Sequence, residues 1–583
     1  MLECEMVVNK TLPACVAFHK PSFLQQLKNT MLDPAMVNAL LTTAARHSPV
    51  MIRRYGAHGG GATAAAEHFA AKTIGTIMQS LDHPSLADIQ ALCLLVIHEW
   101  GSRNAVRAYI YLGQAARMAQ MYRVVHTSHG QSDPDRFLQE ESFRRAMWLI
   151  YILDCFLTSS PGRFPALSAR DVSDVALPCQ DMNYNFGSPV FVRTLSGIAP
   201  SNAPDPNSLA EVGEFGHIVL ATKAWRNVIE MMTTTTLETF SEEECIQLED
   251  GLDAIRQSLP HHFADKPGQI NLHITMGSGY VFAMIHCLLH CATIFVNRRR
   301  ILQMVTAENF SQEAWRMAPH SQAQTVDRIF AASHSIIAML AALEHGADKN
   351  AILCFPIFML FSAFTAGSTV AYLALKGLSP PNVNETATHI VRDSLRYMHD
   401  GAESWPLVIP WNRHLSVMAK VLREVNNQGE RAQSREDSRV PVQGSPSVKD
   451  DITSQPDTNP DAMEYDQAPP PPGSQQGIPT PQMEGRGSEP PIPRRPGVTT
   501  INGGSAGAST PADGTPPPAN NNSGPKMESP DPTSSSSATG GQPPVAPQQA
   551  GGEVDMTAAE LCAAFERQLL ELDDLAAFMG GGV

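Results

Sequence analysis

Two histidines and two cysteines lie close together in one apolar segment of the chain. His286 and His290 are four residues apart, as are Cys287 and Cys291. Residues at i and i+4 share a helical face, so either pair could supply two ligands to a metal ion. The sequence nearby offers no evident third and fourth ligands, and the segment is apolar. The pattern therefore favours satisfied core residues, and we expect no metal ligands in this chain.

The sequence contains no recognisable catalytic set. The ten cysteines show no C-x-x-C spacing and are dispersed through apolar segments, as in reduced intracellular proteins. A nucleophile elbow, a P-loop and an H-E-x-x-H motif are all absent from the sequence. The glycines at 59–61 precede an Ala-rich stretch, but no strand precedes them as a phosphate-binding turn requires. We therefore expect no catalytic residues and a protein that is not an enzyme.

A carboxylate and a guanidinium flank the turn after one apolar helical segment. Asp154 lies at the end of that segment, and Arg163 lies just past a Ser-Ser-Pro-Gly turn. A partly buried carboxylate needs a partner, and this arginine could supply a bidentate ion pair. The two residues could equally be unrelated surface charges. If they pair, the role of the pair is structural.

Helices are predicted to position these residues throughout the first 426 residues. Apolar residues recur there at helical spacing, and no stretch shows the alternation typical of strands. The helical pattern covers residues 62–81, 86–100, 104–122, 133–157, 209–259, 275–305, 322–345, 351–375 and 383–426. We expect one large all-α domain over residues 1–426.

Charge and size patterns predict particular contacts within these helices. Glu140 and Glu141 precede Arg144 and Arg145 by four residues each, which predicts two ion pairs along one helix. Gly113 lies among alanines, which predicts close packing of its helix against a neighbour.

The charge balance argues against a surface that binds DNA by itself. The net charge is −16, and the densest basic run is the three arginines at 298–300. That run lies at the end of an apolar helical segment, where cations complement the helix dipole. Autonomous binding needs clustered positive charge to displace counterions from phosphates. We therefore expect only weak DNA binding without sequence preference.

One uncharged stretch is long enough to cross a bilayer. Residues 351–375 carry no charged side chain. They include Pro356, Gly367 and several hydroxyl residues, and a helix that is apolar all round can also be buried in a large protein. We favour the buried helix and expect no membrane partner.

The composition changes sharply after residue 426. Of the 45 prolines, 24 lie between 441 and 550, where Tyr465 is the single aromatic residue. So few apolar side chains cannot offset the entropy of ordering the backbone, and residues 427–552 are predicted to be a disordered linker. Helical period returns at 557–579, so residues 553–583 are predicted to form a short amphipathic helix.

This last helix combines an apolar face with acidic residues. The residues that define the pattern are Leu569, Leu572, Asp573, Asp574, Leu575 and Phe578. An amphipathic helix beyond a long linker is typical of a segment that folds on a coactivator groove, with its acidic residues at the rim. The alternative is a capping element that packs back onto the helical domain.

Short motifs in the first half of the chain occur in a familiar order. They begin with F-H-x-P-x-F at 18–23 and Q-A-L-x-L-L at 90–95. The residues of the three motifs that follow are Tyr111, Gly113 and Arg117; Arg144, Arg145 and Trp148; and Asp154, Gly162, Arg163 and Pro165. Together they resemble the fungal-specific transcription factor domain, also called the middle homology region, of zinc-cluster transcription factors. The resemblance extends more loosely to a W-P pair at 405–406 and so covers roughly residues 18–426.

The resemblance implies a nuclear regulator of RNA polymerase II transcription. Its helical domain would control a C-terminal activation segment in response to a metabolite or a partner, and its motif residues would be structural. Zinc is expected only in the six-cysteine N-terminal module of the family, which this sequence does not include. DNA contact is therefore expected to be indirect or through that module, and no cofactor is expected in this chain.

Two further expectations concern partners. The C-terminal helix would bind coactivator or mediator-type proteins, and a homodimer is compatible with the family. The alternative function is that of a helical small-molecule-binding protein, or an enzyme of unknown reaction.

Overall fold

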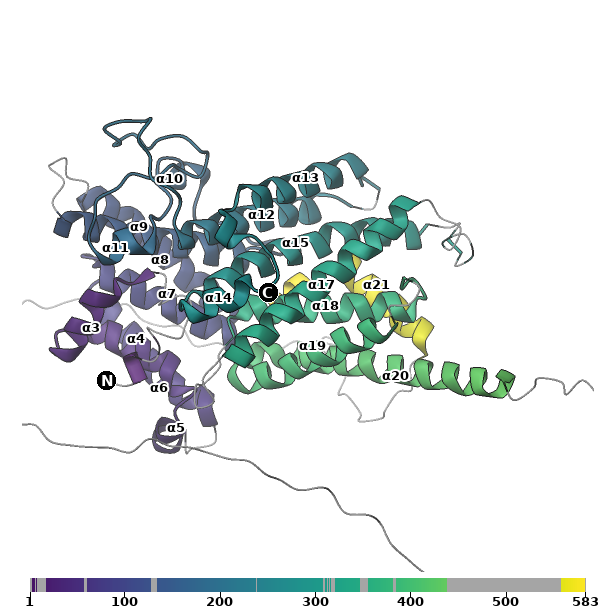
Figure 1. Ribbon diagram of the computed structural model, residues 1–583. Helices are drawn as coiled ribbons and strands as arrows, with labels where there is room; N and C mark the ends of the chain where they lie inside the picture. The colour runs from purple at the N-terminus through teal and green to yellow at the C-terminus, as the bar shows by residue number, and fades with distance from the viewer. Residues whose placement is uncertain are drawn as a thin grey trace, which may run out of the picture. The chain divides into compact units, whose positions relative to one another are not determined.

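A computed structural model confirms the all-α fold (Figure 1). It describes residues 3–5, 7, 17–56, 60–126, 134–236, 238–307, 310–311, 313, 315, 320–346, 355–380, 384–437 and 557–581. These described residues contain no β-strand, only the isolated bridges Ala176↔Thr194 and Val192↔Ala210.

In the first half of the chain, α7 packs against α4, α6, α8 and α9. Their bounds are α3 Lys20–Lys28, α4 Pro34–Ala45, α5 Pro49–Tyr55, α6 Gly61–Ile77, α7 Leu86–Gly101, α8 Ala105–His126, α9 Pro134–Leu157, α10 Ala169–Val172 and α11 Asp181–Asn185. Helix α7 begins at a capping box in which the Ser85 and Asp88 side chains bond each other's backbone N–H groups. The short turn between α7 and α8 makes the expected αα-hairpin.

The second half forms a bundle around α15 and α18. Its bounds are α12 Glu214–Thr234, α13 Glu242–Ser258, η1 His261–Phe263, α14 Gln269–Thr275, α15 Gly279–Val305, α17 His320–Gly346, α18 Ile357–Leu375, α19 Asn384–Ser404, η2 Pro406–Val408 and α20 Ile409–Asp437. Helices α15, α17, α18, α19 and α20 pack side by side (Figure 1). The last elements are α21 Ala558–Leu570 and α22 Asp573–Phe578.

Several helices begin and end differently from the sequence prediction. The segment predicted as 209–259 is two helices, α12 and α13, joined by a turn. The segment predicted as 383–426 is interrupted at Trp405-Pro406, because proline cannot continue the hydrogen-bond ladder. Helix α20 then continues past residue 426 to Asp437. The rest of the predicted linker, 438–552, lies outside the described residues.

The apolar helices form the centre of the core. Among the described residues, three helices are long and apolar enough to cross a membrane: Gly279–Val305, Ala323–Gly346 and Ile357–Leu375. Of the most apolar stretch of each helix, 89% is buried inside the protein in α15 and 94% in α18. Their composition is therefore accounted for by burial among neighbouring helices.

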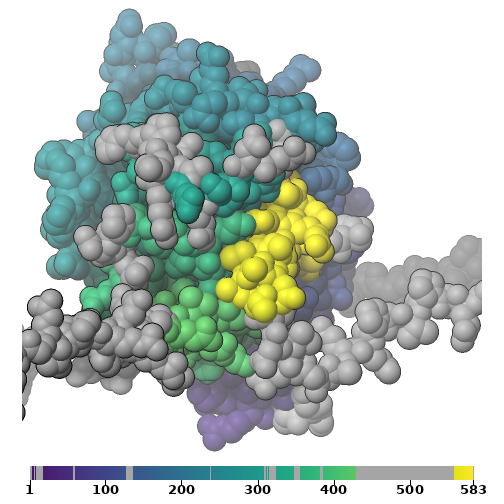
Figure 2. All heavy atoms as spheres, turned by 90° about the vertical axis from the view of Figure 1, so that its right-hand side faces the viewer, coloured from purple at the N-terminus to yellow at the C-terminus, as the bar shows by residue number. Residues whose placement is uncertain are grey.

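The C-terminal helices belong to the same compact unit as the helical domain. Residues 1–440 and 553–583 form this unit. Helix α21 contacts α18 and α20. Figure 2 shows the C-terminal helices, in yellow, seated against the surface of the domain.

Candidate functional site

The predicted C-terminal helix is two helices with a sharp break between them. Helix α21 begins at a capping box formed by Thr557 and Glu560, and the chain turns at Leu572, which has φ +58° and ψ +30°. A left-handed backbone costs a branched side chain roughly 1–2 kcal/mol. The prediction of one continuous helix over 557–579 was therefore wrong. The break redirects α22 into the domain, and burial of its side chains offsets the strain.

The aromatic ring of Phe578 is the deepest anchor of these helices. It is fully buried, and its centroid lies 4.3 Å from that of Phe361 and 5.0 Å from that of Trp100. The rings of Phe156 and Phe358 complete the seat at 6.0 and 5.8 Å. The Trp100 indole N–H also donates a 2.7 Å hydrogen bond to the Phe578 carbonyl. Ring burial and a directional hydrogen bond thus fix the same residue.

The other three predicted anchors are buried as well. Leu569, Leu572 and Leu575 have exposed fractions of 2, 9 and 0%. In the structure the groove that receives all four anchors belongs to the chain's own helical domain. The arrangement matches the capping alternative, in which the helix packs back onto the domain.

A buried ion pair holds the same helix. The Arg298 guanidinium donates a 2.7 Å hydrogen bond to Asp574 Oδ2, and the two side chains are only 6 and 7% exposed. Asp574 also accepts from the Leu575 amide. Asp574 is thus buried, whereas the adjacent Asp573 is exposed. Such a pair does more for the register of α22 than for net stability, since both charges were desolvated.

A second polar contact holds α21. Glu566 Oε1 accepts 2.7 Å hydrogen bonds from Lys376 Nζ and from the Tyr372 hydroxyl, both near the end of α18. The Tyr372 ring also lies 5.5 Å from Phe565, a residue that is buried in the same interface. Burial and the neighbouring carboxylate raise the pKa of Tyr372, so its hydroxyl stays a donor at neutral pH.

The prediction that the arginines at 298–300 lie at a helix C-terminus was wrong. Helix α15 continues to Val305, and all three arginines are buried. Arg299 donates to the Thr235 carbonyl, and Arg300 pairs with Glu242 and Glu249. The run is therefore a set of internal clamps, of which Arg298 is the one that reaches the C-terminal helices.

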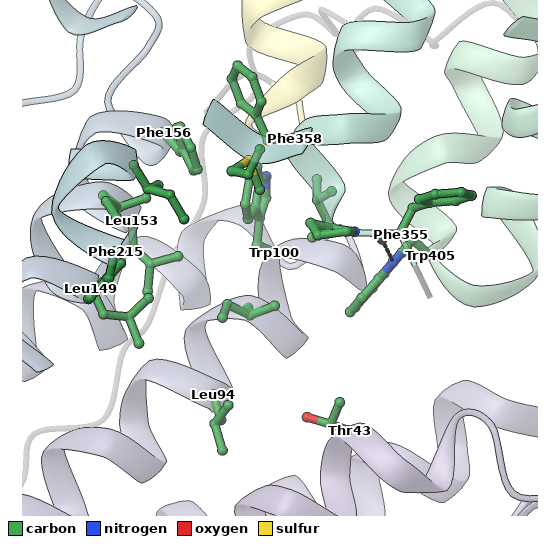
Figure 3. Close-up of a pocket in the computed structure, with 16 residues that line it drawn as sticks. Thr43, Leu94, Trp100, Leu149, Leu153, Phe156, Phe215, Phe355, Phe358 and Trp405 are labelled. Carbon is green, nitrogen blue, oxygen red and sulfur yellow. Dashed lines mark hydrogen bonds between the residues drawn. The ribbon is translucent and has the colours of Figure 1, made fainter. Parts of the chain in front are cut away.

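An apolar pocket adjoins the seat of Phe578 (Figure 3). Its cavity volume is about 90 Å³. The lining residues are Thr43, Leu94, Ile97, Trp100, Leu149, Ile152, Leu153, Phe156, Phe215, Ile218, Met284, Phe355, Pro356, Ile357, Phe358 and Trp405. Trp100, Phe156 and Phe358 therefore line the pocket and also contact Phe578. A molecule in this pocket would share three side chains with the C-terminal anchor.

The pocket lining is almost free of polar groups. Thr43 is its one hydroxyl residue, and no charged side chain lines it. Both indole N–H groups are already used, that of Trp100 by Phe578 and that of Trp405 by the Phe355 carbonyl at 3.2 Å. The pocket therefore suits an uncharged, mainly apolar molecule.

The family-motif residues on α9 form a buried ionic network. Glu141 Oε1 accepts from Arg145 at 3.0 Å and from the Cys179 amide at 3.0 Å. Arg145 also reaches Asp181 at 2.8 Å and stacks over the Tyr184 ring at 4.2 Å. Burial by itself would raise the pKa of Glu141, but the adjacent arginines lower it. The network joins α9 to the segment around residues 179–184.

One of the two predicted ion pairs on α9 is confirmed and the other is wrong. Glu141 pairs with Arg145 as predicted. Glu140 pairs with Arg136 at 2.8 Å, and Arg144 pairs with Glu141. Buried Glu141 attracts both arginines because its charge has no water around it. The Trp148 indole N–H donates to the Ala176 carbonyl at 2.7 Å and ties the same helix to the loop.

The predicted pair of Asp154 and Arg163 does not form. Asp154 instead accepts from the Ala166 and Leu167 amides at 2.9 and 3.0 Å. Arg163 donates to the Leu157 carbonyl and lies 5.3 Å above the Tyr109 ring. The turn contains Gly162 at φ +84°, and it brings backbone amides rather than the guanidinium to the carboxylate.

The remaining motif residues lie nearer the surface. Gly113 does not mediate close packing, because a Cβ built there meets no atom within 4 Å. Tyr111 is half-buried, and Arg117 is exposed and donates to Gln120. Pro165 is exposed in the loop that follows Gly162. None of these side chains joins the C-terminal helices or the pocket.

Sequence reasoning missed the domain side of the site. Side chains of α7, α15 and the end of α18 make polar contacts with the C-terminal helices. They are Trp100, Arg298, Tyr372 and Lys376. Only the three consecutive arginines in an otherwise apolar segment gave a signal, because buried arginines need partners. The partner of Arg298 lies 276 positions away and could not be inferred from spacing.

The comparison with known proteins points to transcription regulators. Residues 12–233 match the fungal-specific transcription factor domain. The Zn(2)-C6 fungal-type transcription factor FTF1c of Fusarium oxysporum f. sp. lycopersici is 24% identical over 412 residues, covering 66% of this chain and 42% of that protein. FTF2 of the same organism is 24% identical over 410 residues, covering 66% and 36%.

A further relative, from Schizosaccharomyces pombe, is also named as a transcriptional regulatory protein. It is 25% identical over 203 residues, covering 33% of this chain and 29% of that protein. The chain spans well under half the length of these relatives. The matched domain and these relatives are described as transcription factors and regulators rather than enzymes, in keeping with the expectation for this chain.

Proposed function

We propose that the chain is a nuclear regulator of RNA polymerase II transcription, on the premise that residues 12–233 match the fungal-specific transcription factor domain. Its helical domain controls the C-terminal segment 553–583, which recruits coactivator or mediator-type proteins when it is released. The observation that carries this proposal is the burial of Phe578 and Asp574 in the chain's own domain.

The docked and recruiting states exclude each other. The four apolar residues that would enter a coactivator groove are the ones that the helical domain buries: Leu569, Leu572, Leu575 and Phe578. Burying each of these side chains contributes roughly 1.5–3 kcal/mol relative to exposing it. Release therefore needs an effector or partner that binds the open state more tightly than the docked state.

The apolar pocket is the candidate effector site, and it favours small-molecule binding as a second function. Its ligand would be uncharged and mainly apolar, in keeping with its lining. Because the ligand would contact Trp100, Phe156 and Phe358, it would bias the position of Phe578 directly. Ligand binding in the pocket would thus be coupled to the docking of Phe578 through shared side chains.

Contact with DNA is proposed to be indirect or through a zinc-cluster module outside this sequence. The net charge of −16 disfavours autonomous binding to phosphates. The zinc-cluster type of the Fusarium relatives is stated in their names. Specificity for target genes would then come from that module or from a partner.

A reporter assay tests the recruiting role. Residues 553–583 fused to an unrelated DNA-binding domain should activate transcription, and the double change Leu572→Ala with Phe578→Ala should abolish most of that activity. Asp573→Asn, on an exposed residue, should have little effect. An expressed wild-type fusion with no activity would remove the recruiting role and leave α21 and α22 as structural caps.

A further inference from the structure

Two histidines of α15 face the loop that follows the short helical turn η1. His286 and His290 lie one turn apart, with ring centroids 6.2 Å apart. The loop follows η1, whose last residue is Phe263, and carries Asp265. The His286 Nε2 atom bonds the Phe263 carbonyl at 2.9 Å, and His290 Nε2 bonds Asp265 Oδ2 at 2.9 Å.

The loop supplies the third ligand that the sequence did not reveal. One ligand atom from each of Asp265, His286 and His290 lies within 4.8 Å of the other two. Two imidazoles and one carboxylate form a donor set that Zn²⁺ takes, with water as the fourth ligand. The Cys287 and Cys291 thiols lie elsewhere, fully buried against α18, so this set contains no sulfur.

Exposure and protonation suit a metal that enters from solvent. The Asp265, His290 and His286 side chains range from partly exposed to fully buried, so the site has an open side. Since Nε2 must carry the proton it donates to the Phe263 carbonyl, the free lone pair is on Nδ1. A carbonyl that fixes the tautomer is the usual outer partner of a metal-binding histidine.

The charges around this cluster make it better suited to bind a cation than a second cluster of similar residues. Glu67, His98 and Glu99 also lie close together, but Arg107 pairs with both carboxylates at 3.1 and 3.0 Å. Arg256 acts electrostatically on Asp265, but its guanidinium is directed to Asp253, the Leu289 carbonyl and Thr293. Arg256 weakens cation binding there without occupying the carboxylate.

We propose that Asp265, His286 and His290 form a Zn²⁺ site that clamps the loop after η1 onto α15. The ion would replace the direct hydrogen bond between Asp265 and His290 and would coordinate all three side chains. With three protein ligands and Arg256 nearby, the expected dissociation constant is about micromolar. The proposal does not depend on the role of the C-terminal helices.

Titration of the purified full chain with Zn²⁺ at pH 7.5 tests the site. We expect one equivalent to bind at about micromolar concentration and to raise the melting temperature, since the ion binds the folded state. Co²⁺ should give the visible spectrum of a tetrahedral nitrogen–oxygen site without a thiolate band. Mg²⁺ should not compete, because it prefers six oxygen ligands.

Matched variants assign the ligands. His290→Gln and Asp265→Asn should each weaken Zn²⁺ binding at least tenfold, whereas His389→Gln, on an exposed residue of α19, should not change it. Asp265 is partly exposed, so its variant should fold even if the His290 variant does not. The absence of saturable binding, or equal affinity in Asp265→Asn and the wild type, would overturn the proposal. A thiolate band with Co²⁺ would do the same, since it would place the ion on cysteines.

Discussion

Asp573 and Asp574 are adjacent acidic residues with opposite surroundings. Asp574 is buried against Arg298, and Asp573 is exposed. Asp574→Ala should lower the free energy of unfolding by about 3 kcal/mol, because it leaves a buried guanidinium unpaired. Asp573→Ala should change it by less than about 0.5 kcal/mol. Chemical denaturation of both variants of the full chain measures the difference, and equal effects would mean that the ion pair does not form in solution.

Buried neutral histidines should make the domain sensitive to acid. Burial lowers the pKa of His217 to about 4, below the unfolded value near 6.5. The unfolded chain therefore takes up the proton first, so stability is complete above pH 6.5 and falls as the pH drops toward 4. His217 alone should contribute a loss of about 2 kcal/mol at pH 5.

Melting temperatures at pH 7 and pH 5 test this titration. Between pH 7 and pH 5 the melting temperature should fall less in His217→Gln than in the wild type. His389→Gln should behave like the wild type, because the His389 side chain is exposed. An identical fall in His217→Gln would show that His217 does not titrate with folding. His47, whose pKa burial also lowers to about 4, should account for part of the remaining loss.

At the scale of elements, two helical glycines have opposite roles. A Cβ on Gly101, at the end of α7, would lie 2.1 Å from the Trp405 ring, whereas a Cβ on Gly113 of α8 would meet no atom within 4 Å. Gly101→Ala should destabilise the domain by about 1–3 kcal/mol through overpacking. Gly113→Ala should stabilise it by about 0.5–1 kcal/mol, because alanine loses less backbone entropy. Thermal melts decide the point, and the same sign for both variants would contradict the packing of Trp405 on α7.

The helices themselves could be predicted from the sequence, and their interruptions only in part. The spacing of apolar residues predicted α7, α8 and α9 close to their observed bounds. The break at Leu572 could not be predicted, because leucine has no preference for a left-handed backbone and local sequence favours a continuous helix. Burial of Phe578 decides that geometry, and it is a tertiary effect.

At the scale of the whole molecule, the contacts that matter for regulation are between distant parts of the chain. Trp100, Arg298 and Tyr372 come from three helices and meet a segment that follows residue 557. The acidic and apolar pattern of that segment identified its anchors but not their partner. A groove on a coactivator and a groove on the chain's own domain place the same physical demands on an amphipathic helix. Sequence alone therefore could not choose between them.

The account's central claim is that the helical domain masks the C-terminal segment. A change on the domain side tests it without altering the segment. Arg298→Gln removes the partner of Asp574, while Arg300→Gln removes a buried partner of Glu249 on the same helix without touching the segment. Glu249 keeps Arg328 and Asn297 as partners in Arg300→Gln, so the two variants are compared at equal protein level to separate unmasking from general loss of stability.

The most direct measurement is therefore reporter activation by the full chain tethered to an unrelated DNA-binding domain. We predict low activity for the wild type, at least a fivefold rise for Arg298→Gln at equal protein level, and little change for Arg300→Gln. A rise of about fivefold corresponds to a shift of about 1 kcal/mol in the docking equilibrium. Equal activity of the wild type and Arg298→Gln, or an equal rise in both variants, would contradict the claim that the docked C-terminal helices hold the protein in its masked state.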